Sequence, residues 1–145
     1  MCKPNILVSV NPTYLCFNNC EYCYLGSLRN EMDVLSISKL NSLLKTVSDK
    51  YNISHVDIYG GDLSTLCKKY LSKLFECIYG FCTDITAISD PFADLVELKN
   101  QFKFNIATSV NAERPYSADL AKSDMLIYTA LPSMISIDAN YFLRF

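Results

Sequence analysis

Short apolar segments alternate with helix-like segments along most of the 145 residues, and this alternation restricts the fold more than any other feature of the sequence. Apolar or alternating runs predict five strands, at 6–10, 55–59, 84–89, 102–110 and 125–130. Apolar residues at helical spacing predict helices at 36–51, 63–78 and 91–98, with a weaker one at 117–121. Such alternation favours an α/β fold of parallel, right-handed βαβ units.

The chain is long enough for one hydrophobic core, since half of its 145 residues are apolar, so we expect a single domain over residues 1–145. In parallel βαβ folds, functional groups gather where the strands end. The strand at 102–110 fits this expectation, because one face alternates small or polar residues suited to the lining of a ligand cavity. That face carries Lys103, Asn105, Ala107 and Ser109, and the opposite face carries Phe102, Phe104, Ile106 and Val110.

Three cysteines lie within eight residues directly after the first predicted strand, at Cys16, Cys20 and Cys23. We interpret them as ligands of an iron–sulfur cluster. A cluster of four irons is usually held by four thiolates, so a three-cysteine loop leaves one iron open. Zinc with His55 as the fourth ligand is an alternative. However, His55 begins the second predicted strand, and a strand of five residues puts it about 15 Å from the other end of the sheet.

Charge and composition give no support to several other classes of function. The net charge is −2 and the 13 basic residues are scattered, so nucleic-acid binding is unsupported. The apolar run at 6–10 is too short for a signal peptide or a membrane span. We therefore expect a cytoplasmic protein, and in a reducing compartment its seven cysteines are better explained as metal ligands and small buried residues than as disulfides. Cys67 and Cys77, ten residues apart on one predicted helix, lie about 15 Å apart, too far to bridge.

Further polar and glycine positions follow the predicted strands on the same edge of the sheet as the cysteines. Gly60 and Gly61 end the second strand, where the chain can adopt backbone angles denied to other residues, and Asp62 can cap the helix that follows. Ser89 and Asp90 follow the third strand, and Ser109 and Asn111 end the fourth. Each of these serines and the asparagine is equally compatible with an ordinary turn.

The spacing Cys16-x-x-x-Cys20-x-Tyr22-Cys23 resembles the signature of the radical S-adenosylmethionine (radical SAM) superfamily. The resemblance implies a partial (βα) barrel, a [4Fe–4S] cluster on Cys16, Cys20 and Cys23, and S-adenosylmethionine as second cofactor. The usual partial barrel has six βα units, whereas about five are recognisable here, and the tail after Leu131-Pro132 is ambiguous. No C-terminal cysteine-rich extension is present, so we expect no auxiliary cluster domain.

The same resemblance implies roles for individual residues. The backbone of Gly60-Gly61-Asp62 would meet the amino group of the cofactor, although the family motif has Glu where this chain has Asp62. Tyr22 would approach the adenine. Ser109 and Asn111 would meet the ribose or the carboxylate, and Ser89 would line the same pocket.

By this resemblance the chain is an oxidoreductase that cleaves S-adenosylmethionine reductively and generates a 5′-deoxyadenosyl radical, which abstracts hydrogen from a peptide or a small molecule. The electron donor would be a protein such as flavodoxin or ferredoxin. One alternative is an activating protein for a glycyl-radical enzyme, which Gly60-Gly61-Asp62 and the short length favour, whereas Leu25 replaces the Asn usual in that branch. A second alternative is a non-catalytic iron–sulfur or zinc module, or a truncated remnant.

Overall fold

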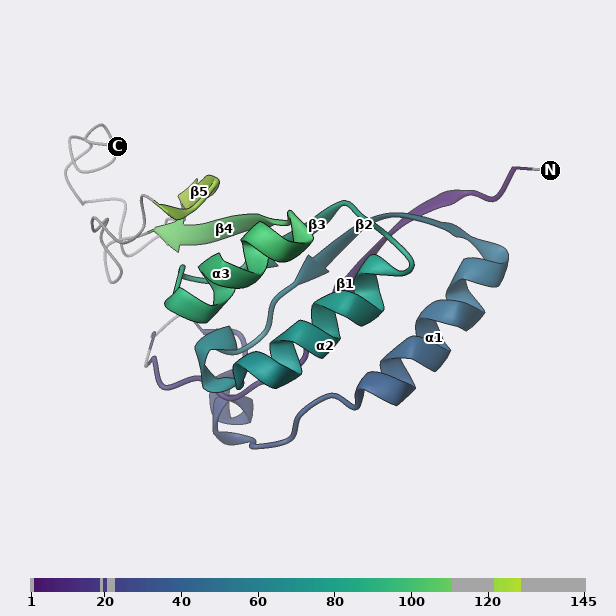
Figure 1. Cartoon of the computed structure of the whole chain (residues 1–145). Coiled ribbons are helices and arrows are strands. Elements are labelled where there is room, and N and C mark those ends of the chain that lie inside the picture. Colours follow the sequence, from purple (N-terminus) through teal and green to yellow (C-terminus); the bar gives the residue numbers. More distant parts are fainter. Residues whose placement is uncertain (1, 19, 21–22, 111–121, 129–145) are drawn as a thin grey trace.

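The computed structural model describes residues 2–18, 20, 23–110 and 122–128, and within them the chain forms one parallel sheet with strand order β1-β2-β3-β4-β5 (Figure 1). The strands are β1 (Asn5–Val10), β2 (Asn52–Ile58), β3 (Ile85–Ile88), β4 (Asn105–Val110) and β5 (Met125–Tyr128). The helices are α1 (Ile37–Lys50), α2 (Lys68–Tyr79) and α3 (Ala93–Phe102), with 3₁₀ turns η1 (Gly26–Asn30) and η2 (Leu63–Thr65).

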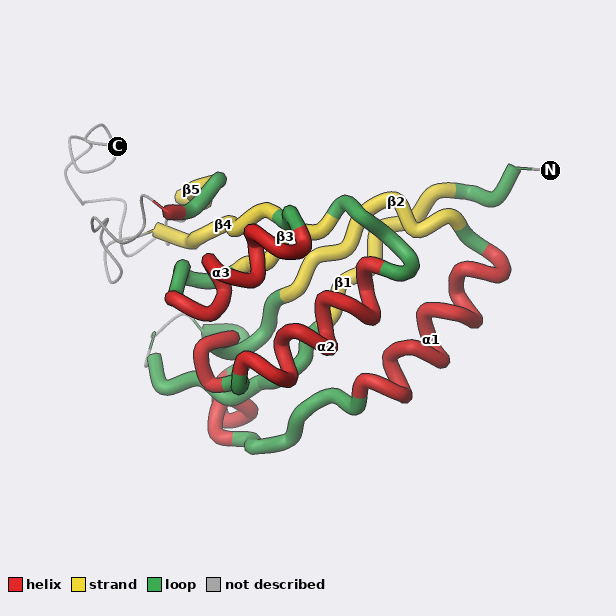
Figure 2. Tube along the Cα trace, viewed as in Figure 1, coloured by secondary structure: helices red, strands yellow, loops and turns green. Residues whose placement is uncertain are grey.

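The helices α1, α2 and α3 lie side by side over one face of the sheet (Figure 2). Strands in consecutive order with every connecting helix on one face are arranged as in part of a (βα) barrel, so the predicted parallel α/β fold is confirmed. The predicted helix at 117–121 and the tail after residue 128 lie outside the described residues. No helix in the described part is long and apolar enough to span a membrane.

The core lies between these helices and the sheet. Its centre is Phe75 of α2, whose ring stacks on Phe104 at a centroid distance of 4.0 Å. Side chains that face the helices from β2, β3 and β4, such as Ile58, Ile85 and Ile106, are almost completely buried. One helix face therefore packs against one sheet face, as the helical and alternating patterns predicted.

Helix α1 begins where the sequence predicted, because the Ser36 hydroxyl accepts a hydrogen bond from the Lys39 N–H. The prediction of one helix over 63–78 is wrong. Asp62 caps the short turn η2 instead, and Leu66 and Cys67 are extended before α2 starts at Lys68. The break lets both Leu63 and Leu66 turn into the core, where they are buried.

The boundary between α3 and β4 also differs from the prediction, which placed Phe102 in the strand and ended the helix at Leu98. Phe102 is the last residue of α3, and Lys103 follows it with a left-handed backbone (φ 54°). This conformation ends a helix in a way that commonly calls for glycine or asparagine. Lysine gives no such signal in the sequence, so the boundary was misplaced.

The chain beyond β2 is held tightly against the chain beyond β1. The Gly61 N–H donates to the Thr13 carbonyl, and the Asp62 N–H donates to the Leu15 carbonyl, both at 2.8 Å. A Cβ on Gly61 would lie 2.2 Å from the Leu15 carbonyl oxygen, and a Cβ on Gly60, which has a φ of 143°, would lie 2.6 Å from that of Thr13. Glycine is required at both positions because only hydrogen fits between the two backbones.

The sheet face opposite the helices carries a polar cluster near the start of β3. His55 Nε2 lies 2.9 Å from Asp57 Oδ1, and His55 Nδ1 lies 3.1 Å from Asp84 Oδ2. Burial alone lowers the pKa of His55, but the hydrogen bonds to Asp84 and Asp57 outweigh it, so the pKa is raised above its usual 6.5. His55 thus links β2 to the turn before β3.

We expect Gly61→Ala to lower the free energy of unfolding by at least about 2 kcal/mol, because the added methyl group overlaps backbone that cannot move without breaking the pairing. Gly80→Ala is the matched control. A Cβ on Gly80 meets its nearest atom at an ordinary 3.4 Å, and its φ is −66°. This control should be neutral or stabilising by up to about 1 kcal/mol. Urea denaturation of both variants measures the difference, and equal stabilities would contradict the tight contact.

We also expect stability to depend on the protonation of His55. A raised pKa in the folded state means that the stabilisation is fully present below about pH 6.5 and is lost as the pH rises through the folded-state pKa. The effect should stay below about 1 kcal/mol, since Asp84 is largely exposed. Urea midpoints between pH 5.5 and 8 measure it. His55→Gln should flatten the dependence of stability on pH, because His55 is the only histidine of the sequence. If this variant keeps the same dependence, other groups cause it.

Candidate functional site

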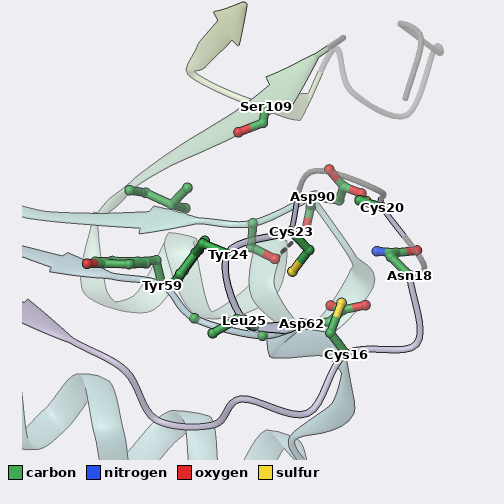
Figure 3. Close-up of a pocket in the computed structure, with 14 residues that line it drawn as sticks. Cys16, Asn18, Cys20, Cys23, Tyr24, Leu25, Tyr59, Asp62, Asp90 and Ser109 are labelled. Carbon is green, nitrogen blue, oxygen red and sulfur yellow. Dashed lines mark hydrogen bonds between the residues drawn. The ribbon is translucent and has the colours of Figure 1, made fainter. Parts of the chain in front are cut away.

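A pocket of about 210 Å³ lies where strands β2, β3 and β4 end, under the cysteine loop (Figure 3). It contains eight of the ten predicted site residues, whereas Tyr22 and Asn111 lie outside the described residues. Its lining consists of Cys16, Asn18, Cys20, Cys23, Tyr24, Leu25, Tyr59, Gly60, Gly61, Asp62, Ile88, Ser89, Asp90 and Ser109.

The three cysteines reach the pocket from one loop, which is bonded to another segment at Cys16 and makes an internal turn at its other end. The Cys16 N–H donates to the Arg29 carbonyl at 2.9 Å, and the Cys23 N–H donates to the Cys20 carbonyl at 3.2 Å. All three thiols are free, and the sulfur atoms of Cys16 and Cys23 point into the pocket (Figure 3). Within the described residues, however, no three acidic, histidine or cysteine side chains are gathered closely enough to form a ready-made metal-binding group.

The pocket favours positively charged groups. Asp62 and Asp90 line it together with the thiols, and among the described residues no Lys, Arg or His does. Burial raises the pKa of the Cys16 thiol; a backbone hydrogen bond from Asn18 lowers it in part, and the charges of Asp62, Cys23 and Cys20 raise it further. A cation placed among these groups would relieve the repulsion between their negative charges.

Asp62 and the two glycines contribute mainly through their backbone. Asp62 Oδ1 accepts a hydrogen bond from the Ser64 N–H at 2.9 Å, so the expected capping role is confirmed. The N–H groups of Gly61 and Asp62 are used by the chain before Cys16. None of the hydrogen bonds found among the described residues ends on the carbonyls of Gly60 or Gly61, which leaves two acceptors beside the pocket.

Ser89 and Ser109 line the pocket from neighbouring strand ends. The Ser89 hydroxyl donates to the Asp90 carbonyl at 3.0 Å, so it already has a partner in its own turn. The Ser89 N–H donates to the Ala107 carbonyl of β4, also at 3.0 Å. Ser109 stands across the pocket from the cysteines, at the end of β4 (Figure 3). The small, polar face predicted for this strand thus reaches the pocket at Ser109.

Sequence reasoning missed Tyr59, Asn18, Leu25 and Ile88 as lining residues, and placed Asp90 only near the rim. Tyr59 could have been found, because it continues the alternation of His55 and Asp57 on the face away from the helices. Partial burial raises the pKa of the Tyr24 hydroxyl, and the charges of Tyr59, Cys23 and Tyr14 raise it further.

His55 does not line the pocket, and both of its ring nitrogens are within hydrogen-bonding distance of carboxylates. The alternative of a zinc site with His55 as fourth ligand is therefore not supported by the structure. His55 is instead a hydrogen-bonded residue of β2.

Comparison with known proteins gives one sequence relative of defined activity. No family model matches the sequence. The chain is 32% identical over 74 residues to 7,8-didemethyl-8-hydroxy-5-deazariboflavin synthase of Trichodesmium erythraeum (strain IMS101). The match covers 51% of this chain and 23% of that enzyme, which is a radical SAM enzyme.

Solved structures share the fold. Tagged anSMEcpe with bound AdoMet matches with a TM-score of 0.60 and 18% identity, over 74% of this chain and 32% of that one. Streptococcus suis SuiB bound to its precursor peptide SuiA matches with a TM-score of 0.56 and 17% identity, over 75% of this chain and 24% of that one. The chain therefore spans between about a quarter and a third of the length of these relatives.

Both solved relatives are radical SAM enzymes, as is the sequence relative. The predicted resemblance of this chain to the radical S-adenosylmethionine superfamily is therefore confirmed, by a partial sequence match to one member and by the fold of two others.

Proposed function

We propose that this chain binds a [4Fe–4S] cluster through Cys16, Cys20 and Cys23 and uses it to cleave S-adenosylmethionine. The observation that carries the proposal is one pocket lined by all three thiols, by the glycine pair and by two carboxylates, with no basic side chain from the part of the chain that the structure describes. S-adenosylmethionine carries a sulfonium and an ammonium group, so its charge complements that lining. Binding of AdoMet by the solved relative anSMEcpe supports the same ligand.

When bound, the reduced cluster supplies the electron that cleaves the sulfonium, and the resulting 5′-deoxyadenosyl radical takes a hydrogen atom from a peptide or small-molecule substrate. The chain's own residues position the ligands. The carbonyls of Gly60 and Gly61 accept from the ammonium group, while Ser109, on the far side of the pocket, donates to the ribose or carboxylate. Tyr22 and Asn111 stay predicted contacts of the same ligand.

Binding of the cluster requires the loop to tighten. The thiols share the pocket without forming a ready-made site, and metal binding often supplies the free energy that orders its ligands. The start of the loop is already held in place, because Cys16 is bonded to Arg29 and the glycine pair is bonded to residues 13–15. A volume of about 210 Å³ lies below the roughly 300–1,000 Å³ usual for small-molecule sites, so S-adenosylmethionine would extend past the pocket mouth.

An activating protein for a glycyl-radical enzyme is less well supported. Its main sequence argument was Asp62 in place of the Glu of the family motif. The Asp62 side chain is short enough to cap the Ser64 N–H two residues ahead, and this local role accounts for aspartate without a glycyl-radical partner.

After anaerobic reconstitution we expect about four irons and four sulfides per chain, and loss of most of them in Cys20→Ala, since each thiolate holds one iron of the cluster. Cys67→Ala is the matched control, because Cys67 is exposed and does not line the pocket. Iron and sulfide assays with visible absorption measure the loading. Zinc in place of iron, or equal iron in both variants, would overturn the assignment of the cluster ligands.

The reconstituted chain should produce 5′-deoxyadenosine from S-adenosylmethionine when a strong reductant is added, measured by liquid chromatography and mass spectrometry. Cys20→Ala should lose this activity together with the cluster. His55→Gln should retain it, because His55 lies away from the pocket. A fully loaded cluster that yields no 5′-deoxyadenosine would instead identify a non-catalytic iron–sulfur module.

A further inference from the structure

Large exposed apolar side chains concentrate beside the pocket. Six of the ten such side chains among the described residues fall between residues 14 and 34, which is about a seventh of the chain. They are Tyr14, Phe17, Tyr24, Leu28, Met32 and Val34, and we call them the loop patch. Phe17 and Met32 are each 80% exposed, whereas scattered exposed apolar residues are normal elsewhere on a protein surface.

Backbone contacts bring the two halves of the loop patch together. Thr13 and Val34 form an antiparallel bridge, and the Leu35 N–H donates to the Pro12 carbonyl at 2.8 Å. The Cys16 N–H reaches the Arg29 carbonyl at the other end. Residues 12–16 therefore run beside residues 29–35, which brings the segment that carries Tyr14 next to the segment that carries Met32 and Val34.

The loop patch meets the pocket at Tyr24, and its charged neighbours between Leu28 and Val34 are two exposed acidic side chains, Glu31 and Asp33, and one half-buried basic side chain, Arg29. Tyr24 belongs to both, since it lines the pocket and is 71% exposed. Glu31 and Asp33 flank Met32, are exposed, and take part in no ion pair found within the described ranges. Inside the pocket the charged lining residues are again acidic, at Asp62 and Asp90. A surface that is apolar with acidic borders complements a segment that is apolar and basic.

We propose that the loop patch docks a polypeptide substrate through a segment in which apolar and basic residues are mixed, and thereby holds a neighbouring residue of that substrate at the pocket. This inference rests on the proposed function, because it takes the occupant to be the substrate of the same site. Apolar contact supplies most of the affinity, while Glu31 and Asp33 select basic over acidic segments. Such docking favours polypeptides over small molecules, which could not cover this surface.

The test is fluorescence anisotropy of the reconstituted chain with three labelled synthetic peptides of equal length, composed of Leu and Lys, Leu and Glu, or Ser and Lys. We expect the Leu/Lys peptide to bind at least about tenfold more tightly than either of the others, because the Ser/Lys peptide lacks the apolar contact and the Leu/Glu peptide is repelled by Glu31 and Asp33. Met32→Ser should weaken its binding about tenfold. Leu43→Ser is the matched control, because Leu43 is 59% exposed on α1 and outside the loop patch.

Reversal of charge sharpens the test. The double variant Glu31→Lys, Asp33→Lys should shift the preference from the Leu/Lys to the Leu/Glu peptide. Equal binding of all three peptides, equal effects of Met32→Ser and Leu43→Ser, or an unchanged preference in the charge-reversed variant would each overturn the proposal. So would a dimer that Met32→Ser dissociates, seen by light scattering, or preferential binding to anionic phosphatidylglycerol vesicles.

Failure of this inference can be told apart from failure of the proposed function. Formation of 5′-deoxyadenosine without any peptide reports the cluster and its ligand alone, whereas anisotropy reports docking alone. If the chain forms 5′-deoxyadenosine but does not discriminate among the peptides, only the docking surface is wrong. If it discriminates among the peptides but forms no 5′-deoxyadenosine, only the radical chemistry is wrong.

Discussion

The pocket depends on the contact between two stretches of backbone, the chain after β2 and the chain after β1. Gly61 and Asp62 donate to the carbonyls of Thr13 and Leu15, and no side chain other than hydrogen fits at the glycines. This pairing carries the β1–β2 register past the ends of both strands and up to Cys16. The cysteine loop therefore starts from a fixed position, although the thiols themselves belong to irregular structure.

This backbone pairing also separates structural from chemical roles within the glycine motif. The N–H groups of Gly61 and Asp62 hold the loop, the Asp62 carboxylate caps the turn that follows, and the carbonyls of the glycines are left beside the pocket. Replacement of Glu by Asp relative to the family motif is explained by the cap, which needs a short side chain. The proposed contact with a ligand ammonium group uses atoms that every residue type possesses, so it does not depend on that replacement.

The charge of the pocket lining and the exposed apolar side chains near it together indicate which ligands the site can bind. Thiols and carboxylates without a basic neighbour favour a cationic ligand, and acidic side chains outside the pocket border an apolar surface. The pocket and the border of the loop patch are both acidic, and for this reason a positively charged partner is proposed for each: a cationic ligand for the pocket and a basic polypeptide segment for the loop patch. The matched region is about a third of the solved relatives at most.

The sequence by itself determined the parallel α/β fold and which strand ends meet, because apolar periodicity and chain connectivity are local properties of the sequence. It also identified Cys16, Cys20, Cys23 and the glycine pair, since their spacing is readable without coordinates. Only the tertiary structure decided which residues complete the pocket, for Tyr59, Asn18 and Asp90 come from separate elements. It likewise decided two helix boundaries. Helix α3 ends at the left-handed Lys103, and α2 begins only at Lys68, because burial of Leu63 and Leu66 overrides the local helical spacing.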